Sequence, residues 1–333
     1  MIYIKKKYSK RAIIIFASLS AILVIVVSVV AINYFADDNK NMNIIVINKC
    51  EYVVSDFWEV AYEGMKEAAI DNGVEFEYMS PLFEHHVEEQ KQVILEAIEK
   101  NPDIIILVAS DYYEIAPYAI MIAEKGIPLI LLDSDVDVSS EYKRLFIGTN
   151  SVKAGNFLGE TALERTEGDN KNAIILSHSR GAQTAVDREE GIRQGYGDEN
   201  IVGTYWCQSD ENVAYDIIME VLVADKSIVN ILCTNENVTI GAARAVSDLG
   251  LEDVIDIYGF DGSKQHVQYL ERGIINATVI QSPYQMGYLS IETAVALLNN
   301  EDVEGIIETD YLLIDADNMY DEGFREILFP FIK

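Results

Sequence analysis

The sequence predicts an α/β protein with two doubly wound parallel-sheet lobes, preceded by one N-terminal transmembrane helix. Three observations predict the lobes. Apolar runs rich in β-branched residues alternate along the chain with helix-length segments whose apolar residues recur every three or four positions. These runs are apolar throughout, as in strands that are buried on both faces of a parallel sheet. About eleven such runs are too many for one sheet of ordinary size, so two lobes are expected.

A long hydrophobic segment lies near the N-terminus. Residues 12–32 contain only three serines as polar interruptions, which is long enough to cross a bilayer, and we predict an anchor over 12–35. Five bases and no acid occupy the flank at 1–11, so this flank is expected in the cytoplasm and the body outside it. A cleaved signal, giving a secreted protein, is the alternative, although Tyr34 stands where a small residue usually precedes the cut.

The charge of the body limits its partners. The formal net charge is −30, and the residues after position 36 contain 20 bases and 55 acids. A body this acidic repels phosphate backbones, so no nucleic acid is expected as a partner. The excess itself is explained most simply as a solvated surface that keeps the protein soluble.

After a polar linker at 36–42, the predicted strands follow one another at regular intervals. The strongest seven are 43–48, 103–110, 127–134, 172–179, 228–235, 254–261 and 276–282, and four weaker ones are 74–79, 144–149, 200–206 and 311–315. Ligands of open α/β sheets bind beyond the carboxyl ends of the strands. Polar residues stand at those ends: Asn48, Ser110, Asp111, Asp133, His178, Arg180, Asn235 and Asp261. Their recurrence predicts a binding crevice.

Around these strand ends the chain resembles the type I periplasmic binding proteins, specifically the ribose/galactose-type sugar-binding group. The likeness runs from Asn43 to about Asp317 in unbroken order. The segments that carry it are SDFWEVAYEGMKEAAIDNG, GIPLILLDSD, AVDREEGIRQG, ILCTNENVTIGAARAV, IYGFDGS and INATVIQSPYQMG. Each segment alone is a weak signal, but six in family order and spacing make a strong case.

The resemblance implies which residues hold a ligand. Phe57 and Trp58 would sandwich a sugar ring, and Ser55 would bond a hydroxyl. The polar rim would consist of Asp133, Arg188, Asn235, Asp261 and Gln281. This chemistry suits a sugar, because flat aromatics cover its C–H faces while carboxylates, amides and arginine pair with its hydroxyls. Trp58 also falls on a helical stripe with Ala61, Met65 and Ala69, so a core role is the alternative.

One departure from the family pattern concerns charge. In the ribose-type pattern an arginine follows the aspartate of the fourth strand, whereas Ser134 follows Asp133 in this chain. One donor fork and one positive charge are therefore missing beside the expected carboxylates. The departure weakens the case for ribose itself and leaves room for a larger ligand, or for one whose own donors replace the arginine.

The resemblance also implies discontinuous lobes joined by a three-strand hinge. The chain would cross between the lobes near Thr149–Asn150, near Gln281–Ser282 and near Leu312. Lobe one would then hold 43–149 plus 282–311, and lobe two would hold 150–281 plus 312–333. Ligand contacts shared by both lobes would favour the closed state.

Three functions can be compared for such a protein. The first is an extracytoplasmic solute-binding protein that delivers a sugar or polyol to an ABC permease; the second is a sensory input protein that signals to a membrane histidine kinase or chemoreceptor. A repressor sharing the two-lobed core is disfavoured, since it should begin with a basic helix-turn-helix. The resemblance implies a monomer without cofactor and without enzymatic activity.

Other constellations are weaker. In SHSRG (177–181), neighbouring strand residues point to opposite faces, which disfavours a catalytic triad. EHHVEE (84–89) is interpreted as a solvated helix start rather than a metal site. Asp133 and Asp261 could resemble glycosidase carboxylates, but their amide and arginine companions suit binding better. Cys50, Cys207 and Cys233 are expected as buried thiols, with a Cys207–Cys233 disulfide left open.

Overall fold

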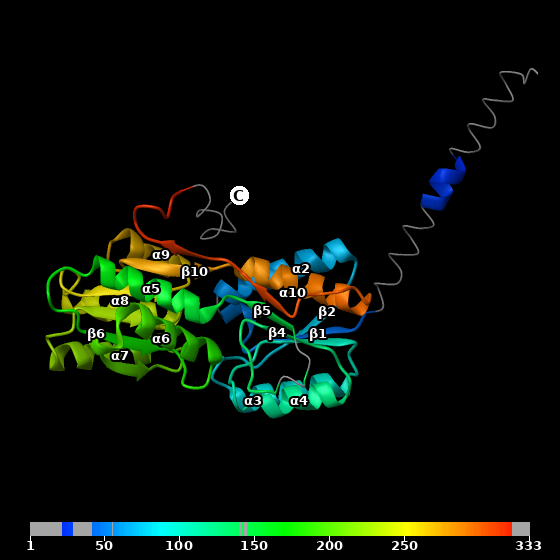
Figure 1. Ribbon diagram of the computed structural model, residues 1–333, viewed down its shortest axis with the longest axis horizontal. Helices are drawn as coiled ribbons and strands as arrows, with labels where there is room; N and C mark the ends of the chain where they lie inside the picture. Colours follow the sequence, from blue (N-terminus) through cyan, green and yellow to red (C-terminus); the bar gives the residue numbers. More distant parts are fainter. Residues whose placement is uncertain (1–21, 29–41, 55, 140–141, 143–144, 322–333) are drawn as a thin grey trace, which may run out of the picture.

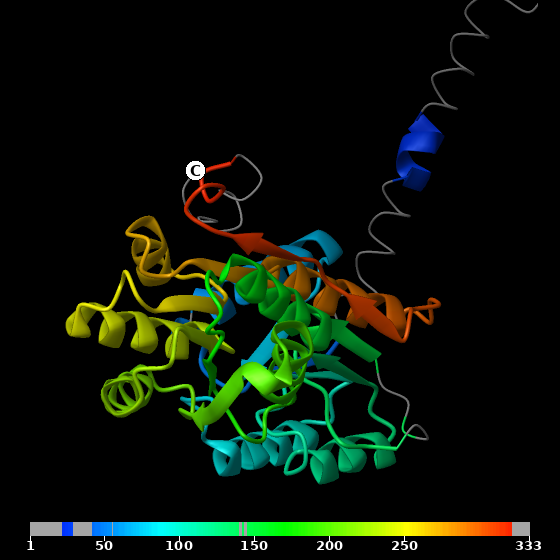
Figure 2. The same ribbon diagram turned by 60° about the vertical axis from the view of Figure 1, so that its left-hand side comes forward.

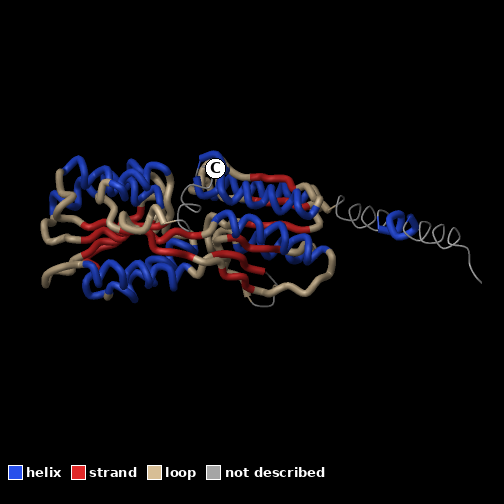
Figure 3. The backbone as a smooth tube through the Cα atoms, turned by 90° about the horizontal axis from the view of Figure 1, so that it is seen from above, coloured by secondary structure: helices blue, strands red, loops and turns tan. Residues whose placement is uncertain are grey.

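The computed structural model describes residues 22–28, 42–54, 56–139, 142 and 145–321. Within these ranges, twelve strands form two six-stranded sheets, and helices cover both faces of each sheet (Figures 1 and 3). The prediction of two α/β lobes is therefore confirmed. The C-terminal part of the chain, coloured orange to red in Figure 2, contributes residues 283–308 to one lobe and a strand at 311–314 to the other.

Lobe one is built on the sheet β2-β1-β3-β4-β5-β11, in which every pair is parallel. Its central strands are buried on both faces, as their apolar runs predicted. The strands are β1 (Ile44–Ile47), β2 (Phe76–Met79), β3 (Ile104–Leu107), β4 (Leu129–Leu132), β5 (Leu145–Gly148) and β11 (Ile306–Glu308). The helical elements are η1 (Tyr52–Val54), α2 (Asp56–Asn72), α3 (Val87–Glu99), α4 (Ala116–Glu124) and α10 (Pro283–Leu298).

Lobe two repeats this order as β7-β6-β8-β9-β10, with β12 added antiparallel to β10. Its strands are β6 (Ala173–Ser177), β7 (Ile201–Trp206), β8 (Asn230–Cys233), β9 (Asp256–Phe260), β10 (Ala277–Gln281) and β12 (Tyr311–Ile314). Its helices are α5 (Ser151–Arg165), α6 (Gln183–Tyr196), η2 (Asp198–Asn200), α7 (Glu211–Ala224), α8 (Glu236–Leu249) and α9 (Lys264–Glu271).

Glycines let two helix pairs approach closely, and each pair positions part of the site. A Cβ on Gly287 of α10 would lie 1.9 Å from the carbonyl oxygen of Ala61 in α2, which begins beside Phe57 and Trp58. A Cβ on Gly155 of α5 would lie 2.4 Å from the carbonyl oxygen of Arg188 in α6. Contacts this short exclude any larger residue, so these glycines fix how closely α2 lies against α10 and α6 against α5.

The chain passes between the sheets three times: after β5, after β10 and between β11 and β12. The third passage lies at residues 309–310, whereas the sequence placed it near Leu312. Leu312 instead lies within β12, where it pairs with Ile280 of β10. The prediction also missed β11, because it is a three-residue edge strand with two exposed positions and lacks a buried apolar run.

Most of the predicted anchor lies outside the described residues. Its described part, 22–28, is helical and exposed. Among the described residues, no helix is both long enough and apolar enough to span a membrane. The three cysteines are buried and free, so the default interpretation is confirmed and no Cys207–Cys233 disulfide forms.

Candidate ligand-binding site

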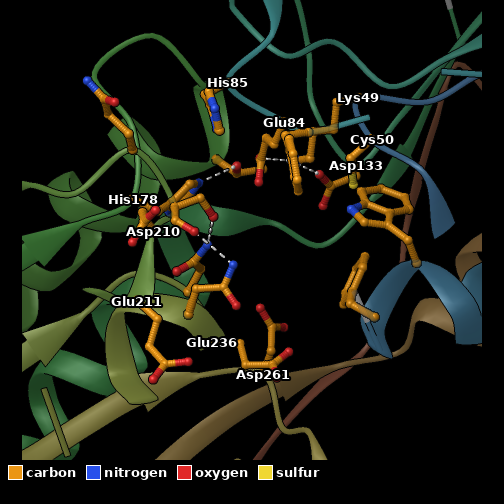
Figure 4. Close-up of a pocket in the computed structure, with 18 of the residues that line it drawn as sticks. Lys49, Cys50, Glu84, His85, Asp133, His178, Asp210, Glu211, Glu236 and Asp261 are labelled. Atoms are coloured by element: carbon orange, nitrogen blue, oxygen red, sulfur yellow. Dashed lines mark hydrogen bonds and ion pairs between the residues drawn. The ribbon is translucent and has the colours of Figure 1, made fainter. Parts of the chain in front are cut away.

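A cavity of about 440 Å³ lies between the lobes, beyond the carboxyl ends of their strands (Figure 4). Lobe one contributes residues that follow β1, β2 and β4, and lobe two contributes residues that follow β6, β7, β8 and β9 together with the last residue of β10. This is the place that the strand-end rule predicted. The size suits a single small molecule.

Seven of the eight predicted site residues line this cavity: Phe57, Trp58, Asp133, Arg188, Asn235, Asp261 and Gln281. Ser55 lies outside the described residues. Six segments far apart in the sequence thus meet at one place. Their contact with a ligand stays a prediction.

The two aromatic rings form one wall of the cavity. Phe57 and Trp58 contact each other edge to face, with ring centroids 4.9 Å apart and planes at 78°. Since the two rings contact each other, no sugar ring fits between them in this structure, and the expected sandwich is wrong. Trp58 is only 4% exposed and packs with Ala61 and Met65, which makes it both a core residue and a cavity wall.

An ion triad missing from the prediction dominates lobe one. The ammonium of Lys49, two residues after β1, lies 2.7 Å from Oε1 of Glu84 and 3.2 Å from Oδ2 of Asp133. It also lies 5.5 Å from the centre of the Trp58 ring, a cation–π distance. Burial lowers the pKa of Lys49, but the negative charges of Glu84 and Asp133 stabilise its ammonium, and the net effect is a raised pKa. The same cation lowers the pKa of Glu84 to about 2 against the effect of its own burial.

Lys49 supplies the positive charge that the sequence comparison found missing. Ser134 stands where the family pattern has arginine, and its hydroxyl donates to Oδ2 of Asp133 at 3.1 Å. The Lys49 ammonium donates to the same oxygen. The cation beside Asp133 therefore comes from the end of β1 rather than from the residue after the aspartate. A lysine directly after a buried strand that ends in Asn48 was the available signal.

The interpretation of EHHVEE as a solvated helix start is wrong for its first residue. Helix α3 begins only at Val87, and the preceding segment turns Glu84 into the cavity beside Lys49 (Figure 4). His85 is exposed and His86 pairs with Glu89. No group of side chains suited to a metal ion occurs among the described residues.

Lobe two presents Arg188 and Gln281 on either side of Asp261. The Arg188 Nη1 donates to the carbonyl of Thr234 at 2.8 Å and lies 3.8 Å from Oδ2 of Asp261. The Gln281 Nε2 donates to Oδ1 of Asp261 at 2.7 Å. Among the buried polar atoms of the described residues that have no hydrogen-bond partner, two belong to these side chains, Nε of Arg188 and Oε1 of Gln281. Buried polar groups are nearly always paired, and both side chains line the cavity, so a bound molecule can supply the missing partners.

Asp133 and Asp261 both have left-handed backbone, with φ of 64° and 66°. Aspartate tolerates this conformation better than most residues, yet it costs free energy and clusters at functional positions. Each aspartate directly follows the strand at the same place in its sheet, β4 and β9. The left-handed turn ends each strand and leaves the carboxylate at the cavity.

Asn235 and Glu236 occupy the start of α8. Asn235 caps the helix, accepting from the amide of Val238 at 3.2 Å, and its own amide donates to Ser209 Oγ at 2.7 Å. Glu236 lies beside Asp261 on the cavity wall (Figure 4). Burial, together with the negative charge of Asp261, raises the pKa of Glu236 to about 7, while the Ser263 hydroxyl opposes that rise.

His178 is a neutral wall residue. Its Nδ1 lies 2.8 Å from the Thr234 hydroxyl, and burial lowers its pKa to about 3. The neighbouring Ser177 donates instead to the carbonyl of Ser179. No serine–histidine pair forms here, as the strand alternation predicted.

The comparison with protein families fits this geometry. A model described as a periplasmic binding protein domain matches residues 44–302, most of both lobes. The chain belongs to the periplasmic binding proteins. The match confirms the type I, ribose-type resemblance that the strand-end motifs carried.

Individual proteins of known name or structure are also similar to this chain. The ribose import binding protein of Haemophilus influenzae is 27% identical over 213 residues, which cover 63% of this chain and 71% of that protein. A sugar transporter structure from Clostridium phytofermentans is 32% identical with a TM-score of 0.74, covering 83% of this chain and 99% of that one. A solute binding protein from Agrobacterium vitis with bound D-fucose is 26% identical with a TM-score of 0.81, covering 86% and 99%. These relatives are binding proteins of transport systems rather than enzymes.

Proposed function

We propose that this protein is an extracytoplasmic solute-binding protein that encloses a sugar or polyol between its lobes and delivers it to an ABC importer. The observation that carries the proposal is the pair of unused polar atoms, Arg188 Nε and Gln281 Oε1, in a cavity with an aromatic wall. A hydroxyl both accepts and donates, so one sugar can satisfy both atoms. The D-fucose complex of the Agrobacterium vitis relative supports the ligand class.

Ligand binding would hold the lobes together. Asp133 and Lys49 come from lobe one, whereas Arg188, Asp261 and Gln281 come from lobe two, so one ligand would contact both. Contacts made to both lobes exist only in the closed form, which is the requirement for ligand-driven closure. The lobes that move would comprise 43–149 with 282–308, and 150–281 with 311–321.

Delivery to an importer would need permease and ATPase subunits. The relatives are named as import or transport proteins, which favours an ABC permease over a sensor kinase as the partner. We propose further that residues 12–32 hold the protein at the outer face of the membrane, since only three serines interrupt this apolar run. Membrane fractionation would test this: recovery of the mature chain in the medium, starting after Tyr34, would contradict the anchor.

The ligand class is tested by thermal unfolding of the full chain in detergent against pentoses, hexoses and inositols. A ligand at about 100 times its Kd adds roughly 2.7 kcal/mol, which raises Tm by a few degrees. Arg188→Ala should abolish the shift, while Arg193→Ala on the same helix, whose charge pairs with Glu189 and Asp198, should keep it. Absence of a shift with every sugar would contradict the proposal.

A further inference from the structure

The charges of the cavity wall do not balance. Six carboxylates line it, and four of them, Glu84, Asp133, Glu236 and Asp261, lie with only two cations, Lys49 and Arg188. His178 does not add a third cation, because burial keeps it neutral. At the rim, Glu211 pairs with Arg244 at 2.6 Å and Asp210 caps α7, so the imbalance lies deeper, among the four inner carboxylates.

One of the two surplus negative charges lies at Glu236, and the other is shared by Glu84 and Asp133, which have only Lys49 between them. Lys49 forms ion pairs with Glu84 and Asp133, and Arg188 forms an ion pair with Asp261. Within the described ranges, Glu236 has no ion pair. Burial and the carboxylates of Asp261, Asp56 and Glu211 raise its pKa, and the Ser263 hydroxyl lowers it. Figure 4 shows Glu236 next to Asp261, across the cavity from Lys49, Glu84 and Asp133.

The unpartnered atoms independently mark this side of the cavity as a ligand contact. Gln281 and Arg188 both border Asp261, both are 3% exposed, and each leaves one polar atom unpaired. A ligand group that fills these positions lies against Asp261 and thus close to Glu236. A ligand in this position lies near two carboxylates, Glu236 and Asp261, and one guanidinium, that of Arg188.

We infer that the ligand is a sugar or cyclitol carrying a protonated amine, and that its ammonium lies between Glu236 and Asp261. The inference rests on the proposed function and narrows its ligand class. An ammonium supplies three donors and one positive charge, so it neutralises Glu236 while the remaining ring hydroxyls meet Arg188 and Gln281. A neutral hydroxyl in the same place would leave Glu236 without a positive charge beside Asp261, so its ionisation would stay unfavourable.

The inference is tested by isothermal titration of the full chain in detergent at pH 6.5, where sugar amines are protonated. The probes are glucosamine, galactosamine and mannosamine, each beside its neutral parent hexose and its N-acetyl form, with an amino-inositol beside inositol. At least one amine should bind tenfold or more tightly than its neutral parent and its acetylated form. Glu236→Gln should weaken that amine at least tenfold more than it weakens the parent hexose, whereas the exposed Glu190→Gln of α6 should affect neither.

A second readout follows from the proton on Glu236. Because its pKa is about 7 without ligand, ionisation against an ammonium releases a fraction of a proton at pH 6.5. The binding enthalpy should therefore vary with the ionisation enthalpy of the buffer, and Glu236→Gln should remove that variation. Equal affinity for a hexose and its amine, unaffected by Glu236→Gln, would overturn the cationic ligand but leave sugar binding intact. Binding of neither class would overturn both proposals.

Discussion

The two lobes share one plan but balance their buried charges differently. In each, an aspartate with left-handed backbone follows the strand at the same place in its sheet, Asp133 after β4 and Asp261 after β9. In lobe one a single lysine at the end of β1 holds two carboxylates. In lobe two an arginine from helix α6 holds one. The fold therefore fixes where the aspartates lie, while each lobe recruits its cation from a different element.

The largest effect is expected from removing the cation of lobe one. Lys49→Met leaves Glu84 and Asp133 buried without a positive charge, which should lower the free energy of unfolding by about 3 kcal/mol or more at pH 7. Urea unfolding of the ligand-free protein measures it. Lys66→Met, which removes an exposed pair with Glu63, should change stability by less than about 1 kcal/mol.

The pH dependence of this variant has a defined sign. Since Lys49 lowers the pKa of Glu84 from 4.5 to about 2, the pair stabilises the fold above pH 4.5 and its contribution fades as pH falls toward 2. The difference between wild type and Lys49→Met should shrink over that window. A difference independent of pH would mean that Lys49 acts by packing alone.

Removing the cation of lobe two should cost less. Arg188→Met leaves one carboxylate unpaired, and burial already raises the pKa of Asp261, so this group can accept a proton more easily. We expect a loss of about 2 kcal/mol at pH 7 by urea unfolding, with Arg193→Met as the control. A loss equal to or greater than that of Lys49→Met would contradict the contrast between the lobes.

Glu236→Gln should stabilise the ligand-free protein in alkaline solution. The pKa of Glu236 is raised to about 7, so its ionisation destabilises the fold as pH rises above the unfolded value of 4.5. Thermal unfolding should show a higher Tm for the variant at pH 8.5 and nearly equal values at pH 4. A variant that is less stable at pH 8.5 would show that Glu236 has a cationic partner in the empty cavity.

The smallest effect concerns contact between the lobes. The Tyr112 amide, after β3, donates to the Gly181 carbonyl, before α6, at 2.8 Å. A Cβ at Gly181 would lie 1.7 Å from Oδ2 of Asp111, whose other oxygen accepts from the Tyr113 and Glu114 amides. Gly181→Ala should therefore hinder closure and weaken ligand binding about threefold, or roughly 0.7 kcal/mol.

A matched control exists for this substitution. A Cβ at Gly305 meets nothing within 4 Å, so Gly305→Ala should leave the affinity unchanged. Titration with the ligand that stabilises the wild type compares the two variants. Equal affinities for both would indicate that the Tyr112–Gly181 contact does not persist in the bound form.

The sequence predicted the architecture because buried parallel strands leave a clear apolar signal. It missed β11, whose register beside β5 comes from tertiary pairing rather than from its own residues. For the site, family motifs identified Asp133, Arg188 and Asp261. Lys49 and Glu84 escaped prediction because a buried ion pair depends on two loops meeting in space, and each residue alone resembles a surface charge.

The discontinuity of lobe one bears on how the chain folds as it is made. Residues 150–281 supply five strands and all the helices of lobe two before α10 and β11 have been synthesised. Until then α2 lacks the helix that packs against it, and Met286, Ile291 and Val295 are missing from its hydrophobic core. We expect lobe two to acquire protease resistance first and lobe one only after α10 emerges. Pulse proteolysis of nascent chains that end near residues 281 and 310 would reveal the order, and resistance of lobe one in the shorter chain would refute it.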